Sequence, residues 1–231
     1  MGFVNFTLQK YNLSYQIPMP LTNHFSVANN YNLAVWKIDE SEESLKNELL
    51  LTPKQHQALT ERKTVNGRQG YLAVRSALVS LGISLEDLSV NEIGAPQLTK
   101  GYCSLSHTNT HAAAVYAQNS VGIDLEAYRP KISRIASKFV HPNEQAFLAQ
   151  LEEVKALTRL WTAKEAIYKA LKIPGLSLRQ QIELMPFDLS DTSGTAKVYL
   201  TEQSCTVQLE FSTFDQHELT IAHNIQHESI H

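Results

Sequence analysis

Cysteine, long apolar runs and an excess of positive charge are the features that this sequence lacks. The 231-residue chain has two cysteines, Cys103 and Cys205, too few for a disulfide framework or a cysteine-rich zinc site. No stretch reaches the roughly 20 apolar residues that a membrane-spanning helix needs. The net charge of −3 argues against a general nucleic-acid-binding protein, because such proteins carry a basic surface for phosphates.

The first thirty residues also lack the charged start and apolar core of a signal peptide. Phe6 stands where the myristoylation pattern requires serine or threonine. We therefore expect a cytoplasmic protein with neither a membrane nor a nucleic acid as a partner. With 43% hydrophobic residues the chain can bury a full core, and its length suits a unit of two lobes.

Both halves of the chain show the same order of patterns, helices followed by strands. Helices are expected at residues 40–51, 54–81 with a break near 66–67, 130–140, 142–156 and 157–173. Strands are expected at residues 32–38, 102–105, 112–117, 121–126, 181–184, 196–200, 206–212 and 218–222. The predicted class is α+β, with helices packed on antiparallel sheets.

The same patterns predict a division into four parts. Residues 1–30 form a loosely structured lead-in, 31–117 an N-terminal α+β half, 118–225 a C-terminal α+β half, and 226–231 a tail. A faint similarity between the segments around Ala73 and Ala163 favours a duplication of the two halves.

The rest of the chain is organised around the segment 160–176. At 100° per residue its apolar stripe consists of Leu160, Ala163, Ile167, Ala170 and Leu171. Glu165 and Lys169 lie on the flank in the favourable i, i+4 order. Lys164 falls inside the apolar arc and must reach water or meet an anion. The pattern fits either a solvated Glu–Lys ladder with one snorkelling lysine, or a carboxylate and two lysines held over an anionic, metal-bound substrate.

The strand 121–126 presents a second group of carboxylates. Gly122, Asp124 and Glu126 share one face, and the intervening apolar residues share the other. The two carboxylates are roughly 7 Å apart along the strand and repel each other unless a cation lies between them, while Gly122 leaves room for another group to approach. An ordinary polar strand face also explains the pattern. Beside Glu165, however, the carboxylates would form the oxygen-rich kind of site that magnesium prefers.

Two further patterns have competing interpretations. The cations Arg62, Lys63, Arg68 and Arg75 form either a solvated helix face or a phosphate-binding surface. The last five residues, His227 to His231, match the zinc-peptidase motif H-E-x-x-H. A zinc site needs a rigid helix and a third ligand, whereas a terminus normally frays. We expect no zinc there.

Several ordered segments resemble the 4'-phosphopantetheinyl transferases, most closely their single-chain, surfactin-synthetase-activating type. The paired signature is Val-Gly-Ile-Asp-Leu-Glu at 121–126 with Trp-Thr-Ala-Lys-Glu-Ala-Ile-Tyr-Lys at 161–169. The segments at 94–98, 105–108 and 175–178 are similar to the family's Gly-x-Pro motif, its Ser-His motif and the segment after the key helix. Together they span about residues 60–180 in the family's order.

The resemblance implies a holo-acyl-carrier-protein synthase that moves phosphopantetheine from coenzyme A to a serine of an apo acyl- or peptidyl-carrier protein and releases adenosine 3',5'-bisphosphate. It also implies two pseudo-symmetric halves in one monomer, with coenzyme A in the cleft between them. Asp124, Glu126 and Glu165 would bind Mg²⁺, and Asp124, Glu165 and Lys169 would be catalytic.

Other residues would contact the coenzyme by the same resemblance. The coenzyme contacts would come from Ser106, His107, Lys164, Lys169, Arg62, Lys63 and Arg68. The basic residues are candidates only, because the spacing in this stretch is shorter than in the family.

Two alternative functions are compatible with the sequence. A non-catalytic module could keep the fold and only hold coenzyme A or a carrier protein, although all three carboxylates and Lys169 are present. A magnesium-dependent phosphotransferase acting on another nucleotide is disfavoured only through the resemblance. Which carrier protein is modified stays open.

Overall fold

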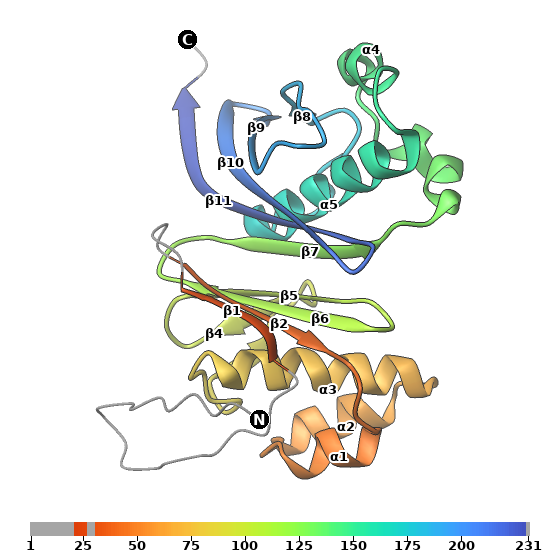
Figure 1. The fold of residues 1–231 in the computed structure, drawn as a ribbon. Helices are drawn as coiled ribbons and strands as arrows, with labels where there is room; N and C mark the ends of the chain where they lie inside the picture. Colours follow the sequence, from red (N-terminus) through yellow and green to blue (C-terminus); the bar gives the residue numbers. More distant parts are fainter. Residues whose placement is uncertain (1–20, 27–30, 230–231) are drawn as a thin grey trace.

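The computed structural model describes the backbone of residues 21–26 and both backbone and side chains of residues 31–229 (Figure 1). Its elements are two antiparallel sheets packed face to face, with helices on the two outer sides. This arrangement confirms the expected mixture of helices and antiparallel sheets.

The first sheet has the strand order β1-β2-β6-β5. Its strands are β1 (Leu21–Ser26), β2 (Tyr31–Lys37), β5 (Tyr102–His107) and β6 (His111–Ala117). The helices α1 (Glu42–Asn47), α2 (Pro53–Thr60) and α3 (Val65–Ser80) precede a small two-stranded sheet of β3 (Leu88–Val90) and β4 (Pro96–Leu98). Thr52 caps α2 and Pro53 begins it, as the Thr-Pro pair predicts.

The second sheet has the strand order β7-β11-β10-β9-β8. Its strands are β7 (Gly122–Ala127), β8 (Ile182–Leu184), β9 (Ser193–Tyr199), β10 (Gln203–Phe214) and β11 (His217–Ser229). The 3₁₀ helices η1 (Pro130–Lys138) and η2 (Pro142–Glu144), the short α4 (Gln145–Leu148) and the long α5 (Glu153–Leu171) lie between β7 and β8.

Three apolar cores hold these layers together. The first lies between α3 and the sheet that contains β6, and the second between α5 and the sheet that contains β10. The third lies between the sheets, where Leu33 and Val115 meet Ile123, Leu125 and Ile221. The apolar side chains of β7 therefore face the other sheet, and its carboxylates face α5.

Several helix boundaries differ from the expected ones. The break before α3 falls at residues 61–64, because Thr64 caps this helix and its hydroxyl accepts from the amide of Gly67. Residues 130–138 form a 3₁₀ helix, and the predicted helix at 142–156 is split into η2, α4 and the start of α5 at Glu153. Periodicity alone does not distinguish these short tight turns from an α-helix.

The two ends of the described chain also correct the prediction. Residues 21–26 of the expected loose lead-in form strand β1, while 1–20 and 27–30 lie outside the described residues. The expected frayed tail is wrong as far as Ser229, because β11 pairs with β10 up to that residue. His227 and Glu228 therefore lie in a strand, where the helical zinc pattern cannot form; His231 lies outside the described residues.

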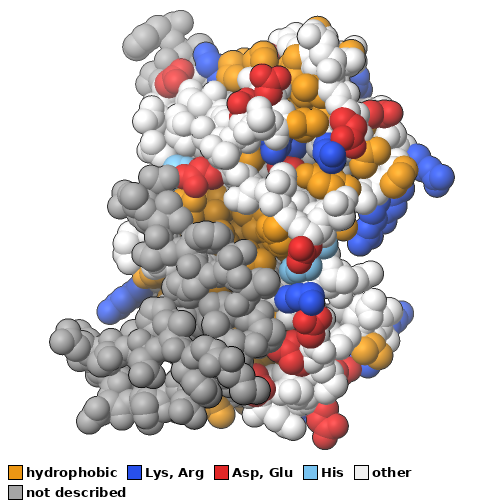
Figure 2. Space-filling model, in the orientation of Figure 1, with side chains coloured by type: hydrophobic (Ala, Val, Ile, Leu, Met, Phe, Trp, Pro, Cys, Tyr) orange, Lys and Arg blue, Asp and Glu red, His pale blue; other side chains and the backbone are white. Residues whose placement is uncertain are grey.

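Figure 2 shows acidic and basic side chains interspersed over one face of the described molecule, in keeping with the small net charge of −3. Within the described ranges, no helix combines the length and the apolar character needed to cross a membrane.

Candidate functional site

Asp124 and Glu126 lie on the face of β7 that α5 covers. The approach of the helix depends on Gly122: a Cβ at this position would come within 1.9 Å of the carbonyl oxygen of Ala166. The room that we expected at Gly122 is thus filled by the backbone of α5. This close contact brings Glu165, the residue before Ala166, to the carboxylates of β7.

The three carboxylates are near enough to influence one another. Burial raises the pKa of Glu165, and the negative charges of Asp124 and Glu126 raise it further. Burial and Asp124 likewise raise the pKa of Glu126, against which Arg129, Lys169 and a hydrogen bond from Trp161 act. The structure therefore places Glu165 beside Asp124 and Glu126, as the sequence predicts, although Glu165 is 39 positions from Glu126 in the chain.

Lys169 lies directly against Asp124. Its Nζ is 2.6 Å from Asp124 Oδ1 and donates to the carbonyl oxygens of Ile123, at 3.1 Å, and Leu105, at 3.4 Å. The resemblance implied that Lys169 contacts the coenzyme. In the structure it lies against Asp124, because the neighbouring strand β7 brings that carboxylate to the lysine.

One carboxylate oxygen at this site has no partner. Asp124 is buried, its Oδ1 is bound by Lys169 and Ser106, and its Oδ2 has no hydrogen-bond partner among the described residues. A buried carboxylate oxygen without a partner is costly unless a cation occupies the site. No group of three or more metal-binding side chains is preformed within the described part of the chain. The orphan oxygen, with Glu126 and Glu165 beside it, nevertheless fits a hard cation such as Mg²⁺.

Ser106 is buried and points into the protein. Its hydroxyl donates to Asp124 Oδ1 at 2.9 Å and accepts from the backbone amide of Leu125 at 3.2 Å. The resemblance implied a contact between this serine and a phosphate of coenzyme A. In the structure its hydrogen is already used by Asp124, so that expectation is not supported.

His107 follows Ser106 at the end of β5 and lies on α3. A Cβ added at Gly70 would come within 2.3 Å of its Nδ1, so only glycine allows the ring to lie there. Burial lowers the pKa of His107, and the cations Lys169 and Arg62 lower it further. The ring is therefore close to both the carboxylate site and the basic stretch.

The basic stretch is mostly engaged by the protein itself. Arg68 forms an ion pair with Glu42 at 2.8 Å, and Arg62 stacks on Tyr71 with its guanidinium carbon 3.9 Å from the ring centroid. Arg75 stacks on the same ring at 3.2 Å, and burial lowers its pKa to about 10. Lys63 is exposed.

Lys164 does not lie at the site. It is fully buried, pairs with Glu144 at 2.9 Å and donates to the carbonyl oxygens of Phe139, Leu178 and Ile182. The expected contact with the coenzyme is wrong, because every donor of this ammonium group is taken by the protein. The anion that the sequence required is therefore the protein's own Glu144.

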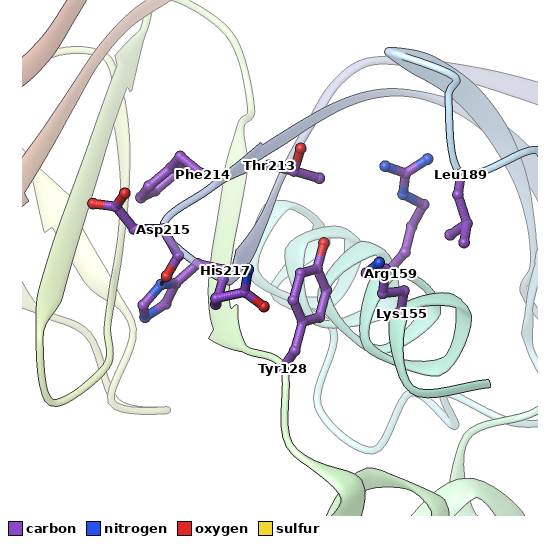
Figure 3. A pocket seen from close by; sticks show the side chains of 9 residues that line it. Tyr128, Lys155, Arg159, Leu189, Thr213, Phe214, Asp215 and His217 are labelled. Atoms are coloured by element: carbon purple, nitrogen blue, oxygen red, sulfur yellow. Dashed lines mark hydrogen bonds between the residues drawn. The ribbon is translucent and has the colours of Figure 1, made fainter. Parts of the chain in front are cut away.

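A second polar cluster was missed at the sequence level. Tyr128 donates to Glu218 at 2.5 Å, and Arg159 binds the same carboxylate at 2.6 Å. Tyr128 and Arg159 border a pocket of about 360 Å³ near the turn between β10 and β11, with Phe214 and His217 on its other side (Figure 3). Strand alternation could have found Tyr128, which continues the face of Asp124 and Glu126. No local pattern pointed to Glu218.

Comparison with known proteins agrees with the geometry. Residues 120–222 match the family model of the 4'-phosphopantetheinyl transferase superfamily. This confirms the resemblance, and the matched range contains all three carboxylates, Lys169, β7 and α5.

A more specific similarity comes from one relative. Over 109 residues the chain is 32% identical to "4'-phosphopantetheinyl transferase gsp" of Aneurinibacillus migulanus. The match covers 44% of this chain and 46% of that protein, so the chain spans about half the length of the curated relative it matches.

Proposed function

We propose that this protein transfers the 4'-phosphopantetheine group from coenzyme A to a serine of an apo acyl- or peptidyl-carrier protein. The observation that carries the proposal is the cluster of Asp124, Glu126 and Glu165 beside Lys169, with a buried carboxylate oxygen that lacks a partner among the described residues. The second product is adenosine 3',5'-bisphosphate. The protein acts as a cytoplasmic monomer on these partners.

Magnesium is the proposed metal ion, held by Asp124, Glu126 and Glu165. When bound, it would neutralise charge on the pyrophosphate. Glu165 accepts the proton of the carrier serine, directly or through water, and its raised pKa suits a general base. The serine oxygen attacks the phosphorus that carries the pantetheine arm, and the bond to the other phosphate breaks.

The positive charges of the site favour the leaving group. Lys169 lies against Asp124 and stabilises the phosphate that departs. His107 is close enough to Lys169 and Arg62 for both charges to lower its pKa, and we propose that it contacts the coenzyme's phosphates. Arg62 and the exposed Lys63 remain candidates for the 3'-phosphate, whereas Arg68 would first have to release Glu42.

We further propose that the two sheets, with residues 31–117 and 118–225, are pseudo-symmetric halves and that coenzyme A binds between them. Strand order supports this. Within residues 31–117 the first strand, β2, lies beside the last strand, β6, and β6 lies beside β5. In the second sheet the first strand, β7, lies beside the last strand, β11, and β11 lies beside β10. Each half also has one long helix between its first and last strands in the sequence: α3 in the first half and α5 in the second.

Intact-mass spectrometry of apo carrier proteins tests the activity. We expect the carrier to gain the mass of one phosphopantetheine group when protein, coenzyme A and Mg²⁺ are present, and to gain nothing with EDTA or with Glu165→Gln. If several diverse carriers stay unmodified by the folded protein while coenzyme A still binds, the protein is a binding module.

A further inference from the structure

Two serines on β5 connect the two sheets. Ser104 and Ser106 are separated by one residue, so both project from the same face of the strand. Ser104 Oγ accepts from the backbone amide of Ile123 at 3.1 Å, and Ser106 Oγ accepts from that of Leu125 at 3.2 Å. Both serines are buried, at 2% and 8% exposure.

These contacts satisfy an open strand edge. Among the described strands, β7 is terminal in its sheet and pairs with β11 alone, so every second amide of β7 points away from its partner. β5 is likewise terminal in the other sheet. The serine side chains thus supply acceptors that a further strand would otherwise provide, and a buried amide without an acceptor is costly.

The two serines differ in one respect. The hydroxyl of Ser106 donates its hydrogen to Asp124 Oδ1 at 2.9 Å, whereas no bond donated by Ser104 Oγ is found among the described residues. A hydroxyl has a single hydrogen to donate. The bond that fixes Asp124 is therefore made by the same side chain that joins β5 to β7.

We propose that Ser106 is a positioning residue for the metal-binding carboxylate. By holding Oδ1 through a neutral hydrogen bond, Ser106 leaves Oδ2 of Asp124 directed at the cation site. The inference rests on the proposed function, because it assumes that this oxygen binds Mg²⁺. It also assigns Ser106 to the protein's own carboxylate and not to a phosphate of coenzyme A.

Ser104→Ala and Ser106→Ala form a matched pair for the test. Each leaves one amide of β7 without its acceptor, so both should lower the melting temperature. Ser106→Ala should lower it somewhat more, because it also loses the hydrogen bond to Asp124. Mn²⁺ binding, followed by electron paramagnetic resonance of the full chain with coenzyme A present and no carrier protein, separates them. Loss of a residue that orients a metal ligand costs about 10–100-fold in affinity. We expect that loss for Ser106→Ala and near-wild-type affinity for Ser104→Ala.

Three outcomes overturn the inference. Equal Mn²⁺ affinity in the two variants makes Ser106 a purely structural link between the sheets. Retained Mn²⁺ affinity with weakened coenzyme A binding in Ser106→Ala, measured by calorimetry, makes it a phosphate contact. Failure of the wild-type protein to bind Mn²⁺ at all overturns the proposed function as well. If Ser106→Ala does not fold, Ser106→Cys keeps the size of the side chain, and as a weak donor it should show the same selective loss.

Discussion

Asp124 contacts Ser106, Lys169 and the proposed metal ion. It is buried, bound by one lysine and one serine on Oδ1, and open on Oδ2. The charge of Lys169 offsets only part of the repulsion among three carboxylates. Individual substitutions here should therefore change metal binding and stability together.

Lys169→Ala should slow catalysis while strengthening the binding of Mg²⁺. We expect kcat to fall by about 10²–10⁴, as for a lost proton donor. Mg²⁺ should act at lower concentration, because a competing positive charge beside Asp124 has been removed. Without metal the variant should lose about 1–3 kcal/mol of stability, because the buried Asp124 carboxylate loses its charged donor and keeps only the hydrogen bond from Ser106.

Magnesium titrations of activity, with thermal melts in EDTA and in Mg²⁺, check this expectation. Lys155→Ala is the control, because its ion pair with Glu152 is largely exposed and worth little. A higher magnesium requirement in Lys169→Ala would show that the lysine supports the metal site.

Glu165→Gln should change how stability depends on pH. The folded-state pKa of Glu165 lies above its usual value of 4.5, so the folded protein holds this proton more tightly than the unfolded chain does. Stability should then fall as pH rises from 4.5 through the raised pKa, and Gln removes that loss. Melts of the metal-free proteins should show Glu165→Gln above wild type at pH 7 and the two converging near pH 4.5.

The same comparison has a clear control. Glu86→Gln changes an exposed carboxylate and should follow the wild-type curve. A wild-type protein that is the more stable one at pH 7 in EDTA would mean that Glu165 has a stabilising partner.

At the scale of elements, α5 is defined by what surrounds it. One side carries the predicted apolar stripe, with Leu160, Ala163 and Ile167 fully buried. A second side lies on β7 at Gly122. The helix is therefore buried on more of its surface than an amphipathic pattern indicates, and Lys164 is tolerated inside only because Glu144 is buried with it.

Gly122→Ala should disrupt the packing of α5 on β7. The new Cβ would overlap the carbonyl oxygen of Ala166, a backbone atom that only a shift of the whole helix can move. We expect a loss near the upper end of the 1–3 kcal/mol typical of overpacking, together with weaker Mg²⁺ binding, because Glu165 would move away from Asp124.

Gly194→Ala is the matched control for urea denaturation and metal titration. Its Cβ would lie 2.8 Å from the ring of Phe211, a side chain of the second core and not the backbone of a helix. Equal losses in the two variants would mean that the separation of helix and strand is not critical.

At the scale of the whole molecule, the proposed site lies where one sheet edge meets the other. β5 supplies Ser106 and His107, while β7 supplies the first two carboxylates. Lys169 donates to carbonyl oxygens of both strands. Distant parts of the second sheet should affect stability more than chemistry.

Deletion of residues 225–231 tests that separation. It removes the end of β11 that pairs with β10, together with Ile225, which packs against the core of the second sheet. We expect a loss of about 1–3 kcal/mol, with transfer at low temperature nearly intact, because Thr220, the neighbour of Asp124 on β11, is retained. Urea denaturation and the mass assay check both parts. Stoichiometric zinc that is lost together with activity on truncation would contradict this expectation.

Local patterns in the sequence determined the α+β class, the apolar stripe of α5 and the shared face of Asp124 and Glu126, because these follow from periods of 3.6 and 2 residues. The motifs also singled out Glu165 and Lys169. The partners of Lys164 and Lys169, the contacts of Ser106 and the pairing of the end of the last strand were decided only by the tertiary structure. These contacts join residues at least 14 positions apart in the chain. The packing of two sheet edges against a helix determines which side chain contacts a given carboxylate. No local periodicity encodes that packing.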